Sequence, residues 1–282
     1  MQRGSWESEG RVHARAERKM LPKGGPLIKP PKAADTLGSL MIDDRNAAIN
    51  TTIIKTANIS DKGGLMKKVV FYGDSNTYGY DPSGMMGGRY PRRSRWTTIL
   101  AEHLEGEWSV ARDGMPGRMI PEAGKGLGYV IDALKAEMPM DLLAVMLGTN
   151  DLLTMRRPDA SKAAEKMENL IAAAQEALGT DILLIAPMQI RFTDPSCTDP
   201  FVRGSGDYAQ RCLEESRLLA RYYEEIARRR GTYFADASSW ETETAFDGVH
   251  LTERGNALFA KEMEKMLREI GEAWNRAQLE KK

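Results

Sequence analysis

The stretch that decides the fold is "KKVVFYGDSNTYGY", residues 67–80. Its apolar run, residues 69–72, stops at Gly73, and an acid, a serine and an asparagine follow directly. A short, continuously apolar run bounded by glycine is typical of a strand buried on both faces. The polar residues would then lie at the carboxyl end of that strand, where ligands bind in open parallel sheets. The stretch therefore predicts a buried strand that ends either in an ordinary turn or at a functional serine.

Four further apolar runs resemble the first, and helical patterns separate them. The predicted strands cover residues 68–72, 108–112, 141–147, 181–187 and 232–236. The helical patterns cover residues 96–107, 126–138, 161–179, 208–230 and 252–274. Strands that alternate with helices favour a parallel sheet covered by helices on both faces. We therefore expect an α/β protein with a five-stranded parallel sheet.

The composition changes near residue 66. Residues 1–65 are rich in Gly, Pro, Lys and Arg, and they show no strong helical or strand period. Such a segment buries too little apolar surface to order itself. We expect residues 1–65 to be a disordered or vector-derived extension, and residues 66–282 to form the functional domain.

Charge and cysteine content narrow the function classes. The 40 basic residues balance the 40 acidic ones, so charge gives no case for a nucleic-acid or membrane partner. No apolar run approaches the roughly 20 residues that cross a bilayer, and residues 1–20 resemble no secretory signal. Cys197 and Cys212 lie outside any CxxC motif, which favours free thiols and a cytoplasmic location. With three histidines and no His/Cys cluster, we expect neither a metal nor another cofactor.

Four polar, glycine-containing turns follow predicted strands. They cover residues 73–76, 113–118, 148–151 and, beyond a short loop, 247–250. The carboxyl ends of parallel strands share one edge of a sheet, so we expect these turns to converge on one rim. Each turn alone is a weak signal, and their convergence is the stronger one.

The residues of this rim suit nucleophilic catalysis. A serine becomes a useful nucleophile when a base takes its proton and a third group orients that base. We expect Ser75 to be the nucleophile, His250 the base and Asp247 the orienting acid. His13 lies in the extension and His103 in a helical pattern, so neither competes.

Attack on a carbonyl also creates an oxyanion, which needs fixed N–H donors. The candidates are the backbone N–H groups of Ser75 and Gly114 and the side-chain amide of Asn150. Two questions remain open at this point. Asp236 is an alternative acid or a loop-capping carboxylate, and Arg118 either neutralises an anionic substrate or braces its own loop.

These residues carry a resemblance to a known family. The blocks 73–75, 114, 148–151 and 247–250 resemble, in order and spacing, the four blocks of the GDSL, or SGNH, hydrolase family. Asp113 stands where the family's second block usually has an asparagine. The resemblance implies a flavodoxin-like three-layer α/β/α sandwich, with Ser75, Gly114, Asn150 and His250 as the named positions. The stretches "YGDSNTYGYDP" and "MLGTNDL" are further similar to the intracellular arylesterase and acyltransferase branch.

The resemblance implies a serine esterase that cleaves short-chain acyl or aryl esters through an acyl-enzyme and also transfers acyl groups to alcohols. The expected partner is a small-molecule ester, and the sequence leaves open whether the chain forms a homo-oligomer. Carbohydrate O-deacetylation and thioester or lysophospholipid cleavage use the same residue types, so they remain alternatives. A catalytically dead α/β binding module is the non-enzyme alternative. A phosphatase of the haloacid-dehalogenase type is disfavoured, because it needs a second carboxylate where Asn76 stands.

Overall fold

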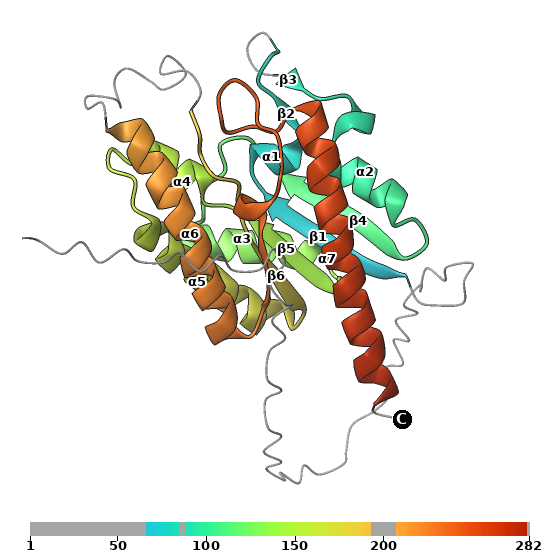
Figure 1. The fold of residues 1–282 in the computed structure, drawn as a ribbon. Coiled ribbons are helices and arrows are strands. Elements are labelled where there is room, and N and C mark those ends of the chain that lie inside the picture. The colour runs from blue at the N-terminus through green and yellow to red at the C-terminus, as the bar shows by residue number, and fades with distance from the viewer. Residues whose placement is uncertain (1–65, 85–87, 193–206, 281–282) are drawn as a thin grey trace, which may run out of the picture.

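The computed structural model describes residues 66–84, 88–192 and 207–280 (Figure 1). The predicted extension, residues 1–65, lies outside the described residues. Within the described ranges, no helix is long and apolar enough to cross a bilayer.

A five-stranded sheet forms the centre of the molecule. Its strands are β1 (Lys67–Gly73), β4 (Trp108–Gly114), β5 (Leu142–Met146), β6 (Asp181–Ala186) and β7 (Tyr233–Asp236). They are hydrogen-bonded in the order β4-β1-β5-β6-β7, and every neighbouring pair is parallel. Every predicted strand is present, and the ends differ from the prediction by at most two residues. The predicted five-stranded parallel sheet is confirmed.

Five long helices cover the two faces of this sheet. They are α2 (Trp96–His103), α3 (Lys125–Ala136), α5 (Ala160–Leu178), α6 (Tyr208–Arg230) and α7 (Glu253–Leu279). Helices α2 and α7 lie on one face, and α3, α5 and α6 lie on the other (Figure 1). The result is the predicted three-layer α/β/α arrangement.

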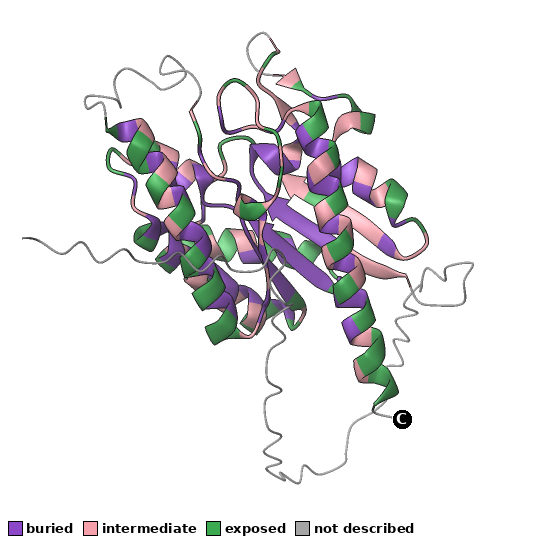
Figure 2. Ribbon diagram, viewed as in Figure 1, coloured by how far each residue is buried: buried purple, intermediate pink, exposed green. Residues whose placement is uncertain are grey.

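The alternation of side chains along β1 shows why both faces need a cover. Val70 and Tyr72 pack into the cluster under α3, α5 and α6, whereas Val69 and Phe71 pack into the cluster under α2 and α7. Each of these side chains is at most 4% exposed. A strand that is apolar on both faces is stable only between two layers. Figure 2 shows β5 buried along its length and β1 buried beyond its first two residues.

Several short elements were not predicted. Two of the expected turns contain short helices instead, α1 (Ser75–Tyr78) and α4 (Thr149–Thr154). The unpredicted β2 (Tyr80–Asp81) and β3 (Gly88–Arg89) pair antiparallel, and two short 3₁₀ helices are η1 (Arg92–Ser94) and η3 (Ala237–Ser239). Elements of two to six residues span at most about two turns, so no apolar period marks them.

Candidate active site

The register of the sheet brings the polar segments together. In β1, Gly73 lies opposite Gly114 of β4 on one side and opposite Met146 of β5 on the other. The chain segments that follow these three residues therefore start from one edge. The segment with residues 247–250 follows β7 and η3 and reaches the same edge, because His250 contacts Ser75.

Ser75 begins a helix at a turn that requires glycine. A Cβ on Gly73 would lie 2.1 Å from Oγ1 of Thr77, so a larger residue does not fit. Asp74 then caps α1, since its Oδ1 accepts a hydrogen bond from the N–H of Asn76 at 3.0 Å. Ser75 is the first residue of α1 and is 6% exposed. Gly73 and Asp74 thus fix where the serine hydroxyl lies.

The structure brings Ser75, His250 and Asp247 together in one chain of hydrogen bonds. Nε2 of His250 lies 2.8 Å from Oγ of Ser75, and Nδ1 of His250 lies 2.6 Å from Oδ2 of Asp247. If Nδ1 carries the proton that is donated to the carboxylate, Nε2 is free to accept the hydroxyl proton. This is the geometry that an activated serine needs.

The carboxyl group of Asp247 also organises its own loop. Its Oδ1 accepts hydrogen bonds from the backbone N–H groups of Val249 and His250, both at 3.0 Å. Burial on its own raises the pKa of Asp247, but hydrogen bonds from the imidazole and from these two N–H groups more than offset it. The pKa of Asp247 therefore lies below its ordinary value, and the carboxylate stays ionised.

The residues expected to form the oxyanion hole lie along the same edge. Gly114 ends β4 opposite Gly73, and Asn150 is the second residue of α4. Nδ2 of Asn150 donates a hydrogen bond to the carbonyl oxygen of Arg118 at 3.0 Å. Asp151 adds a second link, since its Oδ2 accepts from the N–H of Ile120 at 3.0 Å. The primary amide of Asn150 has two N–H groups, and the contact with Arg118 orients both.

Arg118 braces the loop that contains Gly114. Its Nη1 donates to the carbonyl oxygens of Gly73 at 3.0 Å and Asp113 at 2.5 Å, and its Nη2 donates to Oδ1 of Asp113 at 2.7 Å. The guanidinium also lies over the ring of Tyr72, at 4.2 Å. These contacts engage the guanidinium within the protein and support the loop-bracing role over substrate neutralisation. They also give Asp113 a partner in this loop.

Asp236, the alternative acid, caps a loop. Its Oδ1 accepts from the N–H of Ser238 at 3.0 Å and from the Ser238 hydroxyl at 2.6 Å, at the start of η3. The acid that contacts His250 is Asp247.

Asp74 is a buried carboxyl group beside this site. It is 1% exposed, and burial raises its pKa to about 6. The hydrogen bond from Asn76 and the proximity of His250 lower the pKa but only partly compensate for burial. A carboxylate with so little access to water is costly to ionise.

Two neighbours of the site were missed by the sequence analysis. Asn76 contacts the backbone on both sides of His250: its Nδ2 donates to the Val249 carbonyl at 3.1 Å, and its Oδ1 accepts from the Leu251 N–H at 3.0 Å. The ring of Tyr80 lies 4.5 Å from the imidazole of His250, between centroids. Both contacts join segments about 170 residues apart, and no local pattern marks such contacts.

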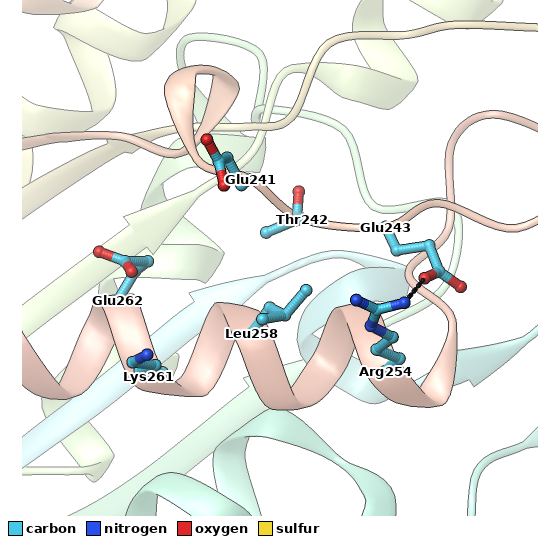
Figure 3. Close-up of a pocket in the computed structure, with 7 residues that line it drawn as sticks. All are labelled: Glu241, Thr242, Glu243, Arg254, Leu258, Lys261 and Glu262. Atoms are coloured by element: carbon cyan, nitrogen blue, oxygen red, sulfur yellow. Dashed lines mark ion pairs between the residues drawn. The ribbon is translucent and has the colours of Figure 1, made fainter. Parts of the chain in front are cut away.

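Two surface hollows lie outside the Ser75–His250 pair. The first, of about 420 Å³, lies between the segment before Asp247 and the start of α7 (Figure 3). Charged side chains line much of it, including Glu243 and Arg254, which form an ion pair at 3.6 Å. The second, of about 520 Å³, borders the loop of Arg118 and is lined by more apolar residues, such as Met119 and Ile120. The second hollow adjoins the proposed oxyanion segment.

Most of the described chain matches a known protein family. Residues 71–258 match the model of the GDSL-like lipase/acylhydrolase family. This match covers all the candidate site residues. No curated protein matches the chain.

Several solved structures share the fold. A protein from Agrobacterium tumefaciens, provisionally named an arylesterase, is 30% identical with a TM-score of 0.60, over 73% of this chain and 100% of that one. A carbohydrate acetylesterase family member from Sinorhizobium meliloti is 28% identical with a TM-score of 0.61, over 72% and 98%. An aryl esterase from M. smegmatis is 25% identical with a TM-score of 0.62, over 72% and 99%.

Proposed function

The chain belongs to the GDSL-like lipase/acylhydrolase family and is thus a carboxylic ester hydrolase, and from this premise we propose that Ser75, His250 and Asp247 are its catalytic triad. The observation that carries the proposal is the pair of contacts at His250. Its two ring nitrogens lie 2.8 Å from the Ser75 hydroxyl and 2.6 Å from the Asp247 carboxylate. A histidine with a purely structural role would not need hydrogen bonds to both a serine hydroxyl and a carboxylate at this edge of the sheet.

The first half of the reaction forms an acyl-enzyme. Nε2 of His250 takes the hydroxyl proton as Oγ of Ser75 attacks the ester carbonyl carbon. The negative charge that develops on the carbonyl oxygen is stabilised by the N–H groups of Ser75 and Gly114 and by the amide of Asn150. His250 then gives its proton to the leaving alcohol, the C–O bond breaks, and the acyl group stays on Ser75.

The second half releases the acyl group. Water attacks the acyl-enzyme while His250 again acts as the base, and Ser75 is regenerated with its proton. An alcohol that replaces water in this step yields a new ester, and we include such acyl transfer in the proposal. Asp247 stays ionised throughout and stabilises the imidazolium.

We propose short-chain acyl and aryl esters as the substrate class. The aryl esterase from M. smegmatis, which shares the fold at 25% identity, supports this class. A carbohydrate acetate is the second candidate, supported by the S. meliloti structure at 28% identity. Small-molecule esters as partners remain a prediction from the proposed chemistry. The expectation of no nucleic-acid or membrane partner and of a cytoplasmic location remains a prediction from composition.

The test is hydrolysis of p-nitrophenyl acetate, butyrate and octanoate by the wild type and by Ser75→Ala. We expect activity that is greatest on the short chains and is abolished in Ser75→Ala. Ser161→Ala is the control, because Ser161 is exposed at the start of α5 and, among the described residues, its hydroxyl bonds only to Asp159 in its own turn. Retained activity in Ser75→Ala would contradict the proposal.

Two further measurements separate the alternatives. A fluorophosphonate probe labels only an activated serine, so absence of label on Ser75 in folded protein would favour a dead binding module. Acetylated monosaccharides tested beside p-nitrophenyl acetate compare the two substrate classes. A kcat/KM for the sugar acetate well above that for the aryl acetate would favour the carbohydrate acetylesterase.

A further inference from the structure

The loop of residues 247–251 holds its own shape. Asp247 binds the backbone of this loop, and the carbonyl oxygen of His250 accepts from the N–H of Ala245 at 2.7 Å. These internal contacts fix the imidazole against the Asp247 carboxylate. They do not fix how far the imidazole lies from Ser75, which belongs to a different segment. The carbonyl oxygen of Gly248 also accepts from the N–H of Arg191 at 2.9 Å, which ties the loop to the segment after β6, but a contact between the loop and α1 relates the imidazole directly to the segment of Ser75.

Asn76 provides this contact. Its side chain is 5% exposed and makes one hydrogen bond to Val249 and one to Leu251, at 3.1 and 3.0 Å. These residues lie on either side of His250, so Asn76 holds the backbone there at two points. Asn76 also directly follows Ser75 in the chain. The nucleophile and the anchor of its base therefore move as one unit.

The anchor is itself immobilised. The N–H of Asn76 donates to Asp74, and its carbonyl oxygen accepts from Nε1 of Trp96 at 2.8 Å. The N–H of Trp96 in turn donates to Oδ1 of Asn256 on α7 at 3.1 Å. The amide has one satisfied orientation, because a flip would oppose its oxygen to the Val249 carbonyl and its NH₂ to the Leu251 N–H.

We propose that Asn76 is a positioning residue that docks the loop of residues 247–251 onto α1 and so sets the distance between Ser75 and His250. The inference rests on the proposed function, since it assigns a role in the same reaction. Loss of the anchor leaves the Asp247–His250 pair intact within its loop but releases the pair from Ser75. A displacement of about 1 Å at a reacting group costs on the order of 100-fold in rate.

The main variant is Asn76→Leu, which keeps the approximate size of the side chain and removes both polar ends. We expect kcat on p-nitrophenyl acetate to fall about 100-fold, with KM changed less than about threefold, because the alignment and not the substrate site is affected. The downfield proton-NMR signal of the imidazole proton shared with Asp247 should persist. Asn76→Asp keeps the acceptor for Leu251 and loses the donor for Val249, so we expect an intermediate loss.

Gln175→Leu is the control. Gln175 on α5 is half-buried, and its Nε2 donates to the carbonyl oxygen of Arg230 at the end of α6, at 2.8 Å. The variant loses an amide that bonds to a distant backbone group, without touching Asn76 or the residues on either side of His250. We expect a lower melting temperature, with kcat within about threefold of the wild type.

The outcomes are distinct. Wild-type kcat in Asn76→Leu overturns the inference, as does loss of the downfield signal or an equal fall of kcat in Gln175→Leu. If Asn76→Leu fails to fold, wild-type kcat in the folded Asn76→Asp variant overturns it instead. Ser75→Ala, measured in parallel, separates the two proposals: if it stays active the proposed function fails, and if it is inactive while Asn76→Leu is fully active only the inference fails.

Discussion

Asp247 divides its two carboxylate oxygens between two tasks. One oxygen accepts from two backbone N–H groups and closes the loop, and the other contacts the imidazole of His250. An amide in its place has only one oxygen. A side chain that must accept on both sides is therefore poorly replaced by asparagine.

Asp247→Asn should lower kcat by about 1,000- to 10,000-fold with little change in fold. The amide either loses the loop contacts or presents NH₂ to Nδ1, which favours the tautomer in which Nε2 carries the proton and cannot accept another from Ser75. The measurement is kcat for p-nitrophenyl acetate, with circular dichroism to confirm folding.

Asp236→Asn is the control for this prediction. Asp236 caps η3, and asparagine is as good a cap as aspartate, so activity should be retained. A large loss in Asp236→Asn together with an active Asp247→Asn would reverse the assignment of the acid.

Asp74 makes stability depend on pH in an unusual direction. The pKa of this carboxyl is raised from 3.8 to about 6 in the folded protein, chiefly by burial. Between these two values the folded state binds more protons than the unfolded state, so stability falls as pH rises. Above pH 6 the full cost of a shift of about two pKa units remains, on the order of 2–3 kcal/mol.

Asp74→Asn removes this cost and should retain the cap of α1, since asparagine is also a favoured N-cap. We expect the variant to unfold at higher urea concentration than the wild type at pH 8, with the gain shrinking towards pH 4. Asp132→Asn is the control, because the Asp132 carboxyl on α3 is exposed. An equal gain at pH 4 and pH 8 would rule out ionisation of Asp74 as the cause.

At the scale of elements, β4 and α1 approach each other at Gly114. A Cβ on Gly114 would lie 2.3 Å from the backbone nitrogen of Tyr78, well inside van der Waals contact. The close approach is between backbones, so no side-chain rotation relieves it. The end of β4 can therefore approach the helix that begins with Ser75 because residue 114 has no side chain.

Gly114→Ala should separate these two elements. We expect a lower melting temperature and a fall in kcat of at least about 100-fold, because both the serine helix and a proposed oxyanion donor shift. Gly128→Ala is the matched control, since a Cβ there meets nothing within 4 Å and Gly128 lies inside α3. That substitution should raise stability by up to about 1 kcal/mol and leave kcat unchanged. Wild-type kcat in Gly114→Ala would show that the approach is not needed.

The elements that sequence could predict are those long enough to carry a pattern. The five strands of the sheet were found because each contains a short apolar run between helical patterns, and that run is continuous in β5 and β6. Helix α6 was predicted with the bounds it has, residues 208–230. Helix α1 has four residues and α4 has six, so each fell within an expected turn. The capping contact of Asp74 in α1 depends on the backbone geometry of the turn, which the presence of an aspartate allows but does not determine.

The site residues also divide into those that the sequence could predict and those that it could not. The rim could be predicted from the ends of strands, and the structure does bring Ser75, His250 and Asp247 into contact. Their catalytic roles stay predictions until the variants are measured. Asn76 was missed and Arg118 was left between two roles, of which the structure supports loop-bracing, because the fold alone determines where the partners of these side chains lie.

At the scale of the whole molecule, the sheet, its covering helices and the candidate triad all lie between Lys67 and Leu279. We predict that a chain starting at Met66 folds and cleaves p-nitrophenyl acetate with kcat/KM within about threefold of the full chain. The measurement compares the two proteins in activity and in melting temperature. A truncated chain that fails to fold, or that loses most of its activity, would show that residues 1–65 take part in the fold or the site.

The separation of Ser75 from His250 by 175 residues has a consequence for biosynthesis. At about 5–20 residues per second, a ribosome needs roughly 10–35 s to travel from the proposed nucleophile to the proposed base. All five strands of the sheet precede His250, but helix α7, which covers one face of the sheet, follows it, so that face is covered only after the proposed base has been made. Esterase activity can therefore appear only after the C-terminal part of the chain has been made. A message cut short before codon 250 would yield a chain without the proposed base and without α7, and we expect such a chain neither to fold nor to cleave esters.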